Sequence, residues 1–274
     1  MNKFVIFSIF VLAFTLSCYQ SNKNSPKAIE GVLDLETWEF ERDGNLKLEG
    51  DWEFYWGELL EPKDFKTNKC PPESKSCDNF IPQPDYIKIP SLWTRENLKE
   101  SNPNNSSKNN DFGNLGYATY RLKIKNFKQK VLSLNLYYIN TAYKLFINGE
   151  FIQEIGRVGK SKEESIPSKK SLDHTFESSG EKLEIVLQVS NYYHRAGGTW
   201  EPFLMGKPES LYLDLIHIII SDIFICGVLT VMGMYHIGLY SLRKKDLSPF
   251  WFGLFCICLS IRSLVTGSQV AYLF

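Results

Sequence analysis

The chain has 274 residues, which is enough for one large domain or two small ones. Its 31 Lys and Arg residues balance its 31 Asp and Glu residues, so the formal net charge is zero and no basic excess points to nucleic acid as a partner. Aromatic residues make up 14% of the chain. That share suits a fold rich in β-strands combined with anchoring at a membrane interface.

Residues 1–18 are typical of an export signal. Lys3 is followed by the apolar run Phe4–Leu16, which is short for a membrane span. The run ends at Thr15-Leu16-Ser17-Cys18, which resembles a bacterial lipobox, where the cysteine is lipidated. Lipidation of Cys18, ordinary cleavage and an uncleaved anchor remain open, and each of them predicts export of the region after residue 18. The polar residues 19–28 are expected to form a linker.

Residues 29–206 show the alternation of apolar and polar side chains that half-buried strands require. The segments with this pattern are residues 46–56, 117–124, 131–138, 142–147 and 182–190. Asn148-Gly149 predicts a tight hairpin turn, because both central positions of that turn need positive φ. Short strands separated by turns predict a mainly β protein with an antiparallel jelly-roll sandwich.

Two features of this region have alternative explanations. Cys70 and Cys77 close a short polar loop of an exported domain, which favours a disulfide over a metal site. Trp52, Phe54 and Trp56 share one face of a strand. Such a stripe could be a binding platform, but it is more often core, because aromatic side chains dominate core burial.

Two apolar segments, residues 211–242 and 248–270, come after the predicted sandwich and are long enough to cross a membrane as helices. The connection at residues 243–247 begins with Arg243-Lys244-Lys245, and short basic loops favour the cytoplasm. This topology places residues 29–206 in the periplasm of a bacterium. The inner membrane is the expected location of the chain, because a lipid on Cys18 and the two spans would have to reach the same bilayer.

The two predicted spans each carry a charged residue, Asp222 in the first and Arg262 in the second. Charges within a membrane are costly and usually face a partner. Their heights in an antiparallel pair permit a direct ion pair. The alternative is that Asp222 reaches the interface and the long side chain of Arg262 extends outward to it.

Several separated motifs of this chain resemble the bacterial seven-transmembrane receptors with diverse intracellular signalling modules. The motifs are Gly31–Phe40, Leu48–Leu60, Ile89–Trp93, Gly116–Leu122, Leu145–Glu150 and Gly233–Asp246. The resemblance implies a jelly-roll, galactose-binding-like sensor domain similar to carbohydrate-binding modules, then a seven-helix bundle and a cytoplasmic output domain. Only two spans are present here, so a separately encoded remainder of the receptor is one candidate partner.

The best candidate for a ligand-binding loop is residues 191–201, which come directly after a predicted strand. They supply aromatic planes, an imidazole, a guanidinium and a carboxylate, and glycines that permit close approach. The candidate residues there are Tyr192, Tyr193, His194, Arg195, Trp200 and Glu201. Trp93, Arg95 and Arg157 are weaker candidates. The alternative to ligand binding is that the aromatic residues pack in the core and the charged residues are solvated.

The sequence predicts no enzyme, metal site or cofactor. It contains no nucleophile elbow, no His-Glu-x-x-His motif and no glycine-rich phosphate loop, and its carboxylates are scattered. The expected function is therefore that of a membrane-anchored sensor for a small, carbohydrate-like ligand. Two alternatives remain: a protein-interaction module that senses nothing, and a remnant of a receptor gene without output.

Overall fold

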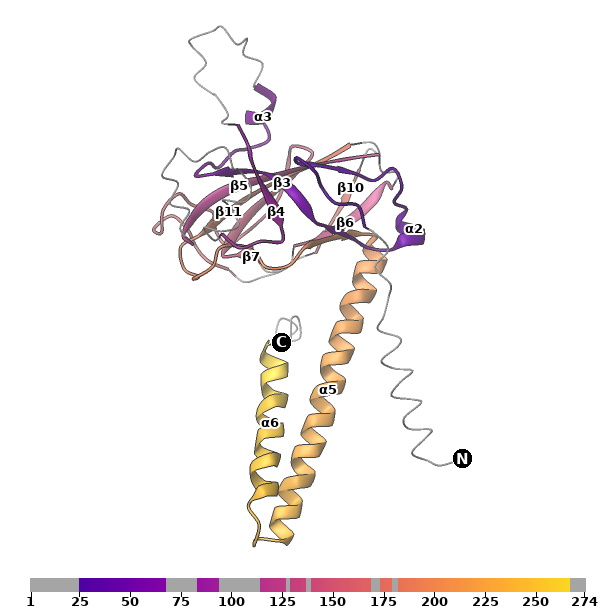
Figure 1. Ribbon diagram of the computed structural model, residues 1–274, viewed down its shortest axis with the longest axis vertical. Coiled ribbons are helices and arrows are strands. Elements are labelled where there is room, and N and C mark those ends of the chain that lie inside the picture. Colours follow the sequence, from indigo (N-terminus) through magenta and orange to yellow (C-terminus); the bar gives the residue numbers. More distant parts are fainter. Residues whose placement is uncertain are drawn as a thin grey trace. The chain divides into compact units, whose positions relative to one another are not determined.

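The computed structural model describes residues 25–67, 83–93, 114–126, 129–136, 139–168, 173–178 and 182–266 (Figure 1). The chain divides into two compact units, Met1–Lys207 and Pro208–Phe274. The first unit is a β-sandwich and the second is a pair of long helices. The predictions made for Cys18, Cys70, Cys77 and Arg95 concern residues outside the described ranges.

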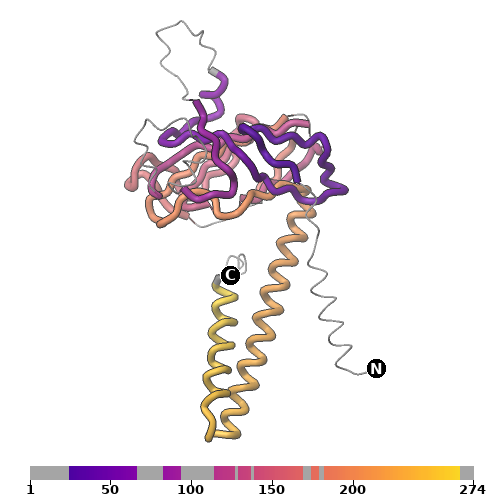
Figure 2. Tube along the Cα trace, viewed as in Figure 1, coloured from indigo at the N-terminus to yellow at the C-terminus, as the bar shows by residue number. Residues whose placement is uncertain are grey.

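The sandwich consists of a seven-stranded and a four-stranded sheet. Figure 2 traces the course of the chain through it. The first has the order β4-β3-β5-β11-β8-β9, with β1 beside β5, and the second has the order β10-β6-β13-β2; β7 and β12 form a small ribbon. The described pairings are antiparallel apart from that of β1 with β5. The mainly β, antiparallel architecture is thus confirmed.

The strands β2, β3, β5, β6, β8 and β11 coincide with the alternating segments of the sequence, and the other strands lie outside those segments. Their bounds, with those of two short helices, are β1 (Val32–Asp34), α2 (Phe40–Asp43), β2 (Leu46–Leu48), β3 (Gly50–Trp56), α3 (Asp64–Thr67), β4 (Asp85–Ile89), β5 (Gly116–Lys125), β6 (Val131–Asn135), β7 (Ile139–Asn140), β8 (Ala142–Ile147), β9 (Glu150–Ile155), β10 (Asp173–Glu177), β11 (Lys182–Asn191), β12 (Gly198–Thr199) and β13 (Phe203–Gly206). The predicted hairpin turn joins β8 to β9, and both of its central residues have positive φ, 51° at Asn148 and 91° at Gly149.

The core lies between the two large sheets and is built from alternate residues of their strands. Trp52 and Phe54 of β3 are fully buried, and Trp56 packs against the same core. The ring of Trp52 meets that of Phe203 from the four-stranded sheet at 5.5 Å between centroids. The three-aromatic stripe is therefore core, and the sequence prediction is confirmed. The opposite face of the seven-stranded sheet carries Glu53, Tyr55 and other polar or charged side chains.

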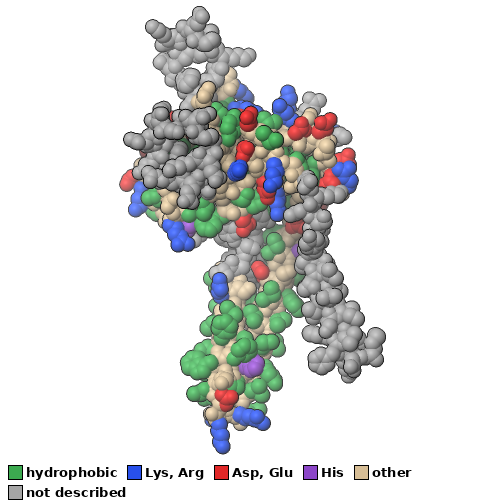
Figure 3. All heavy atoms as spheres, in the orientation of Figure 1, with side chains coloured by type: hydrophobic (Ala, Val, Ile, Leu, Met, Phe, Trp, Pro, Cys, Tyr) green, Lys and Arg blue, Asp and Glu red, His purple; other side chains and the backbone are tan. Residues whose placement is uncertain are grey.

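The second unit contains α5 (Pro208–Leu242) and α6 (Ser248–Thr266). Both are long and apolar enough to cross a membrane, and hydrophobic side chains cover much of their surface (Figure 3). The first helix begins at Pro208, three residues before the predicted 211, because proline suits the first turn of a helix. The second begins at Ser248 as predicted, and its described part ends at Thr266.

The helices pack closely where two glycines meet. A Cβ added to Gly233 would lie 2.9 Å from the carbonyl oxygen of Gly253, so larger residues cannot occupy this crossing without separating the helices. About two turns from Gly253 along α6, the hydroxyl of Ser260 lies 2.8 Å from that of Thr230 and 3.0 Å from the sulfur of Cys226. These contacts fix both the register and the facing surfaces of the pair.

The ion pair between Asp222 and Arg262 stays a prediction. Asp222 is half-buried on α5 and Arg262 is exposed on α6. Ser260 faces α5, and Arg262 lies two residues further on, which is roughly 200° around a helix with about 100° per residue. Direction around the helix, as well as height along it, therefore decides whether the two charges meet.

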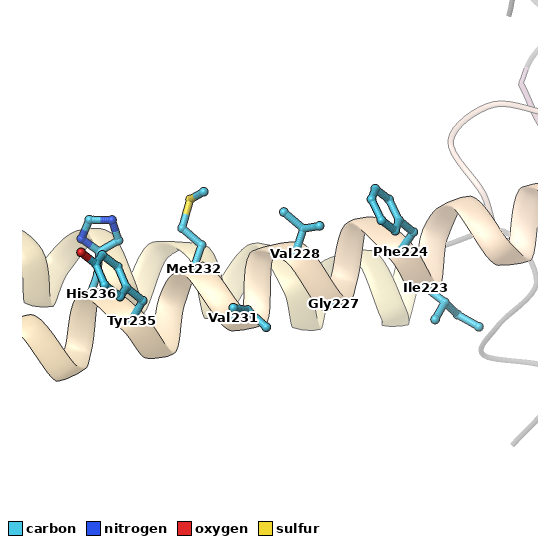
Figure 4. A pocket seen from close by; sticks show the side chains of 8 residues that line it. All are labelled: Ile223, Phe224, Gly227, Val228, Val231, Met232, Tyr235 and His236. Atoms are coloured by element: carbon cyan, nitrogen blue, oxygen red, sulfur yellow. The ribbon is translucent and has the colours of Figure 1, made fainter. Parts of the chain in front are cut away.

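An apolar hollow of about 680 Å³ runs along one side of α5 (Figure 4). Its lining residues are Ile223, Phe224, Gly227, Val228, Val231, Met232, Tyr235 and His236. All of them belong to the membrane-spanning helix, and none of them is a predicted ligand-binding residue. This hollow is therefore a different feature from the candidate site in the sandwich.

Candidate functional site

The six main candidate residues lie together in the segment between β11 and β13, residues 191–201, which we call the site loop. Its backbone is tied to two other parts of the chain. Gly198 and Thr199 pair with β7, the amide of Trp93 donates to the carbonyl of Gly197 at 3.0 Å, and the amide of Thr199 donates to the carbonyl of Ser91 at 3.0 Å. The loop is therefore held on both sides by backbone hydrogen bonds.

Asn191 fixes the beginning of the site loop and was missed by the sequence analysis. Its side chain is fully buried. The Oδ1 atom accepts the backbone N–H of His194 at 3.0 Å, and Nδ2 donates to the carbonyl oxygens of His194 and Asn114, both at 2.7 Å. An Asn that ends a strand and bonds to its own backbone a few residues later is a known turn signal, which could have identified this role.

The two adjacent tyrosines join the site loop to the segment after β9. The hydroxyl of Tyr192 donates to the carbonyl of Lys160 at 2.5 Å, and that of Tyr193 donates to the carbonyl of Lys162 at 3.0 Å. Burial, followed by the influence of Tyr117 and of the nearby glutamates, raises the pKa of Tyr192, so its hydroxyl remains a donor. Tyr193 is 51% exposed, and the Nζ atom of Lys162 lies 5.6 Å from the centroid of its ring.

His194 and Trp200 form the second aromatic part of the loop. Their ring centroids are 5.9 Å apart and the rings are inclined by 68°. Trp200 is 45% exposed, whereas His194 is half-buried, and Arg195 and Glu201 are exposed beside them. The structure thus gathers an accessible indole, an accessible phenol, an imidazole and two opposite charges on one short segment with a fixed backbone.

Trp93, a weaker candidate, does not join this set of exposed side chains and packs as the core alternative expects. Its side chain is fully buried. Its ring packs at 5.0 Å and 89° against that of Trp56, and its indole N–H donates to the hydroxyl of Tyr120. A Cβ added to Gly197 would lie 2.4 Å from the ring of Trp93. The loop glycines therefore permit close approach to a core tryptophan, not only to a ligand.

Arg157, the other weak candidate that the structure describes, has a local role. Its guanidinium Nε donates to the carbonyl oxygen of Glu164 at 2.7 Å, and its backbone pairs with Ile166. It thereby closes the turn to which both tyrosines are bonded. Its side chain is exposed, so it supports the neighbouring segment rather than lining a pocket.

A cluster of four charged residues on the outer face of the seven-stranded sheet was not predicted. Arg121 lies 3.2 Å from Glu53 and 2.5 Å from Glu184, and Lys123 lies 2.7 Å from Glu53. The guanidinium also lies 4.1 Å above the ring of Phe65. We call Glu53, Arg121, Lys123 and Glu184 the ion cluster. Its carboxylates are already paired, so the removal of one partner would leave a poorly solvated charge on the sheet.

The described residues provide no group of three or more His, Cys, Asp or Glu side chains that could hold a metal ion. The arrangement at the site loop instead offers flat aromatic faces with hydrogen-bonding groups beside them. This combination suits a small polar molecule with an apolar ring face.

Comparisons with protein families and with curated proteins found no match. Among solved structures, the Ruminococcus gnavus β-glucuronidase is 12% identical with a TM-score of 0.39, over 60% of this chain and 28% of that one. A GH2 β-galacturonidase from Eisenbergiella tayi is 10% identical with a TM-score of 0.36, over 60% and 24%. A Bacteroides uniformis β-glucuronidase 2 is 14% identical with a TM-score of 0.36, over 59% and 17%. The chain thus spans less than a third of the length of each of these proteins.

Proposed function

We propose that this chain is the sensor part of a membrane-anchored bacterial receptor, with its sandwich in the periplasm and its helices in the inner membrane. The sandwich binds a small, carbohydrate-like ligand at the site loop. The observation that carries this proposal is the exposure of Tyr193 and Trp200 on a loop whose backbone is fixed by Asn191 and by the β7–β12 pairing.

The physical argument rests on preorganisation. A saccharide presents apolar ring faces together with many hydroxyl groups, so it binds where aromatic planes lie beside fixed donors and acceptors. A loop that is ordered before binding loses little conformational entropy when the ligand arrives. The hydroxyls of both tyrosines are already bonded to carbonyl oxygens of Lys160 and Lys162, so their rings are held in place before a ligand arrives.

Binding to the full chain in detergent micelles or nanodiscs tests this proposal. Isothermal titration with methyl glucoside, methyl galactoside, N-acetylglucosamine, glucuronate and galacturonate is expected to show binding by at least one of them. Trp200→Ala removes the exposed indole face and is expected to weaken that binding by roughly 5- to 100-fold, corresponding to about 1–3 kcal/mol of lost aromatic contact.

Phe151→Ala is the matched control, because Phe151 is an aromatic side chain of β9 that is 56% exposed. It lies next to the Asn148-Gly149 turn, at the other end of β8 from the site loop. Its removal is expected to leave the affinity unchanged. Equal losses in both variants would contradict the location of the site. A wild-type chain that binds none of these sugars would contradict the carbohydrate proposal and leave the protein-interaction module as the next hypothesis.

We further propose that binding is passed to the membrane through β13. This strand comes directly after the site loop, and only Lys207 separates its last residue, Gly206, from Pro208 at the start of α5. The strand is paired with β2 on one side and β6 on the other, and its Phe203 is fully buried. Because a single residue joins β13 to α5, a displacement of the strand is expected to displace the start of the helix as well.

An insertion of Gly-Ser-Gly-Ser between Lys207 and Pro208 tests this coupling. The flexible insertion is expected to leave the affinity for the sugar intact and to abolish any change that the sugar causes in hydrogen–deuterium exchange of the first turns of α5. A replacement of Lys207 by Gln, which keeps the length, serves as the control. A ligand-dependent change that survives the insertion would contradict transmission through β13.

A further inference from the structure

One face of α5 carries the apolar hollow described above, which ends at a histidine. The hollow runs from Ile223 to His236, and Figure 4 shows the imidazole at one end of the row of side chains. Its lining residues fall into two rows with a spacing of four, one beginning at Ile223 and the other at Phe224. Packed helices interdigitate by ridges with this spacing. The face therefore has the pattern of a surface that packs against another helix.

The helix α6 does not cover this face. Its contacts with α5 involve Cys226, Thr230 and Gly233. With about 100° per residue, these positions lie on average roughly 160° around the helix from the centre of the hollow. Within the hollow, nothing lies within 4 Å of a Cβ added to Gly227. A further helix can therefore approach α5 closely at Gly227 without displacing α6.

In a membrane, the hollow lies inside the hydrocarbon core. The stretch Ile223–Leu242 contains no Asp, Glu, Lys or Arg and has the length of about 20 residues that a spanning helix needs. His236 lies about 9 Å before Leu242 along the helix axis. The Cα–Cβ bond of a helical residue tilts toward the N-terminus, so this side chain starts out away from the basic loop and its membrane surface. His236 is thus a polar group held within the apolar layer.

The imidazole of His236 has aromatic neighbours but no hydrogen bond among the described residues of α5 and α6. Its ring centroid lies 4.6 Å from that of Phe252 and 5.3 Å from that of Tyr235, and the ring meets that of Phe252 at 74°. Hydrocarbon contains no water to supply a hydrogen bond, and an unsatisfied polar group there is costly. A partner that brings a hydrogen-bonding group to this depth would remove that cost.

We propose that the hollow is occupied by α5 of a second copy of the chain. Two copies inserted in the same direction place identical residues at the same depth, so His236 lies opposite His236 of the second copy. A neutral imidazole has one nitrogen that donates and one that accepts, so two imidazoles can bond to each other. Gly227 likewise meets Gly227 of the second copy, which lets the two backbones approach.

The identity of the occupant follows from this symmetry. A helix of another protein would need a polar residue at the depth of His236 and a small residue at that of Gly227, whereas a second copy supplies both by having the same sequence. The inference goes beyond the proposed function, because it concerns the membrane helices alone and does not depend on sugar binding.

Sedimentation equilibrium of the full chain in density-matched detergent tests the dimer. The wild type is expected to dimerise reversibly. Gly227→Leu fills the centre of the hollow and is expected to weaken the dimer by about tenfold or more. Cys258→Leu is the matched control, because it also introduces a leucine in place of a small residue, at an exposed position of α6. It is expected to leave dimerisation unchanged.

Two substitutions test the role of His236. His236→Leu removes the donor and the acceptor and is expected to weaken the dimer by about 3- to 10-fold. His236→Asn keeps a donor and an acceptor and is expected to retain the dimer. If His236 only filled space in the interface, the apolar leucine rather than the asparagine would retain it. An unchanged far-ultraviolet circular dichroism spectrum shows that the variants keep their helices and strands.

The outcomes decide the inference without reference to the sugar site. A wild-type chain that stays monomeric at every protein-to-detergent ratio overturns it, and leaves lipid or a helix of another protein as the occupant of the hollow. A dimer that is equally strong in Gly227→Leu and Cys258→Leu overturns its location on this face of α5. A dimer weakened by Gly227→Leu and His236→Leu, but not by Cys258→Leu or His236→Asn, supports it.

Discussion

Arg121→Met is expected to destabilise the sandwich by about 1.5–3 kcal/mol, since it removes the charge-assisted hydrogen bonds to two carboxylates while Glu53 keeps Lys123 as a partner. Glu53 and Glu184 both bond to this guanidinium, and Arg121 and Glu53 keep only 15% and 7% of their side-chain surface exposed. Methionine replaces the aliphatic part of arginine, so the effect reports mainly the loss of charge. Urea denaturation followed by tryptophan fluorescence measures it, because five of the six tryptophans, at positions 38, 52, 56, 93 and 200, lie in the sandwich unit.

Lys123→Met is the matched control for that substitution. Lys123 also bonds to Glu53, at 2.7 Å, but its side chain is 38% exposed, so water screens the pair. Partly exposed ion pairs contribute about 0–1 kcal/mol. A loss in Arg121→Met no larger than that in Lys123→Met would contradict the assignment of the ion cluster as a stabilising element of the outer face.

Gly198→Ala is expected to destabilise the sandwich by about 2–4 kcal/mol and to abolish sugar binding with it. Gly198 has φ of 95°, which costs a residue with a Cβ about 1–2 kcal/mol. An added Cβ would also lie 2.7 Å from the carbonyl oxygen of Ser91 and 3.1 Å from the ring of Trp93, which adds the cost of overpacking. Because Gly198 pairs with β7, its displacement would move the whole site loop.

Gly57→Ala separates the backbone cost of positive φ from the cost of overpacking, which together make up the loss of stability expected for Gly198→Ala. Gly57 also has positive φ, 73°, but nothing lies within 4 Å of an added Cβ. Its substitution is expected to cost only the backbone part, about 1–2 kcal/mol, and to leave binding intact. Both variants are compared by thermal denaturation and by titration with the best-binding sugar. Equal costs would show that Trp93 and Ser91 do not crowd the site loop.

The strands of the sandwich could be predicted because alternation is a local property of the sequence. The alternation of β3, β5, β8 and β11 identifies each strand, and Asn148-Gly149 identifies one turn. The partners that pack against a strand are not a local property. Trp93 resembles an exposed site residue in the sequence, yet its burial depends on Tyr120 and on Gly197, which is more than 100 residues away along the chain.

The contacts of the ion cluster and of the charged residues in the helices likewise depend on partners that are distant in the sequence. Glu53, Arg121 and Glu184 come from three different strands, with 63 and 68 residues separating the bonded pairs, so no spacing rule reveals them. For Asp222 and Arg262, the sequence indicates height along each helix but not which faces meet. The contacts of Ser260 and Gly253 determine that direction, and both involve residues that the sequence presents only as small members of an apolar run.

The sequence predicted which segment holds the candidate site but not how its side chains are arranged. It placed six candidate side chains between two strands, and the structure brings them together on one fixed loop. Two amides with long-range partners fix the loop: Asn191 is buried, and Asn140 is half-buried and donates to the carbonyl of Ala196. Only Asn191 has a local signal. Their contribution is visible only once β7, β11 and β12 are placed in space.

Hydrogen–deuterium exchange of the full chain in nanodiscs, with and without its best-binding sugar, tests the central claim most directly. The account predicts slower exchange in peptides that cover residues 191–201, accompanied by a change in the first turns of α5 from Pro208. Trp200→Ala is predicted to remove both effects at the same sugar concentration. Two results would contradict sugar binding at the site loop. One is protection confined to the outer face around Arg121, and the other is exchange that the sugar leaves unchanged throughout the sandwich.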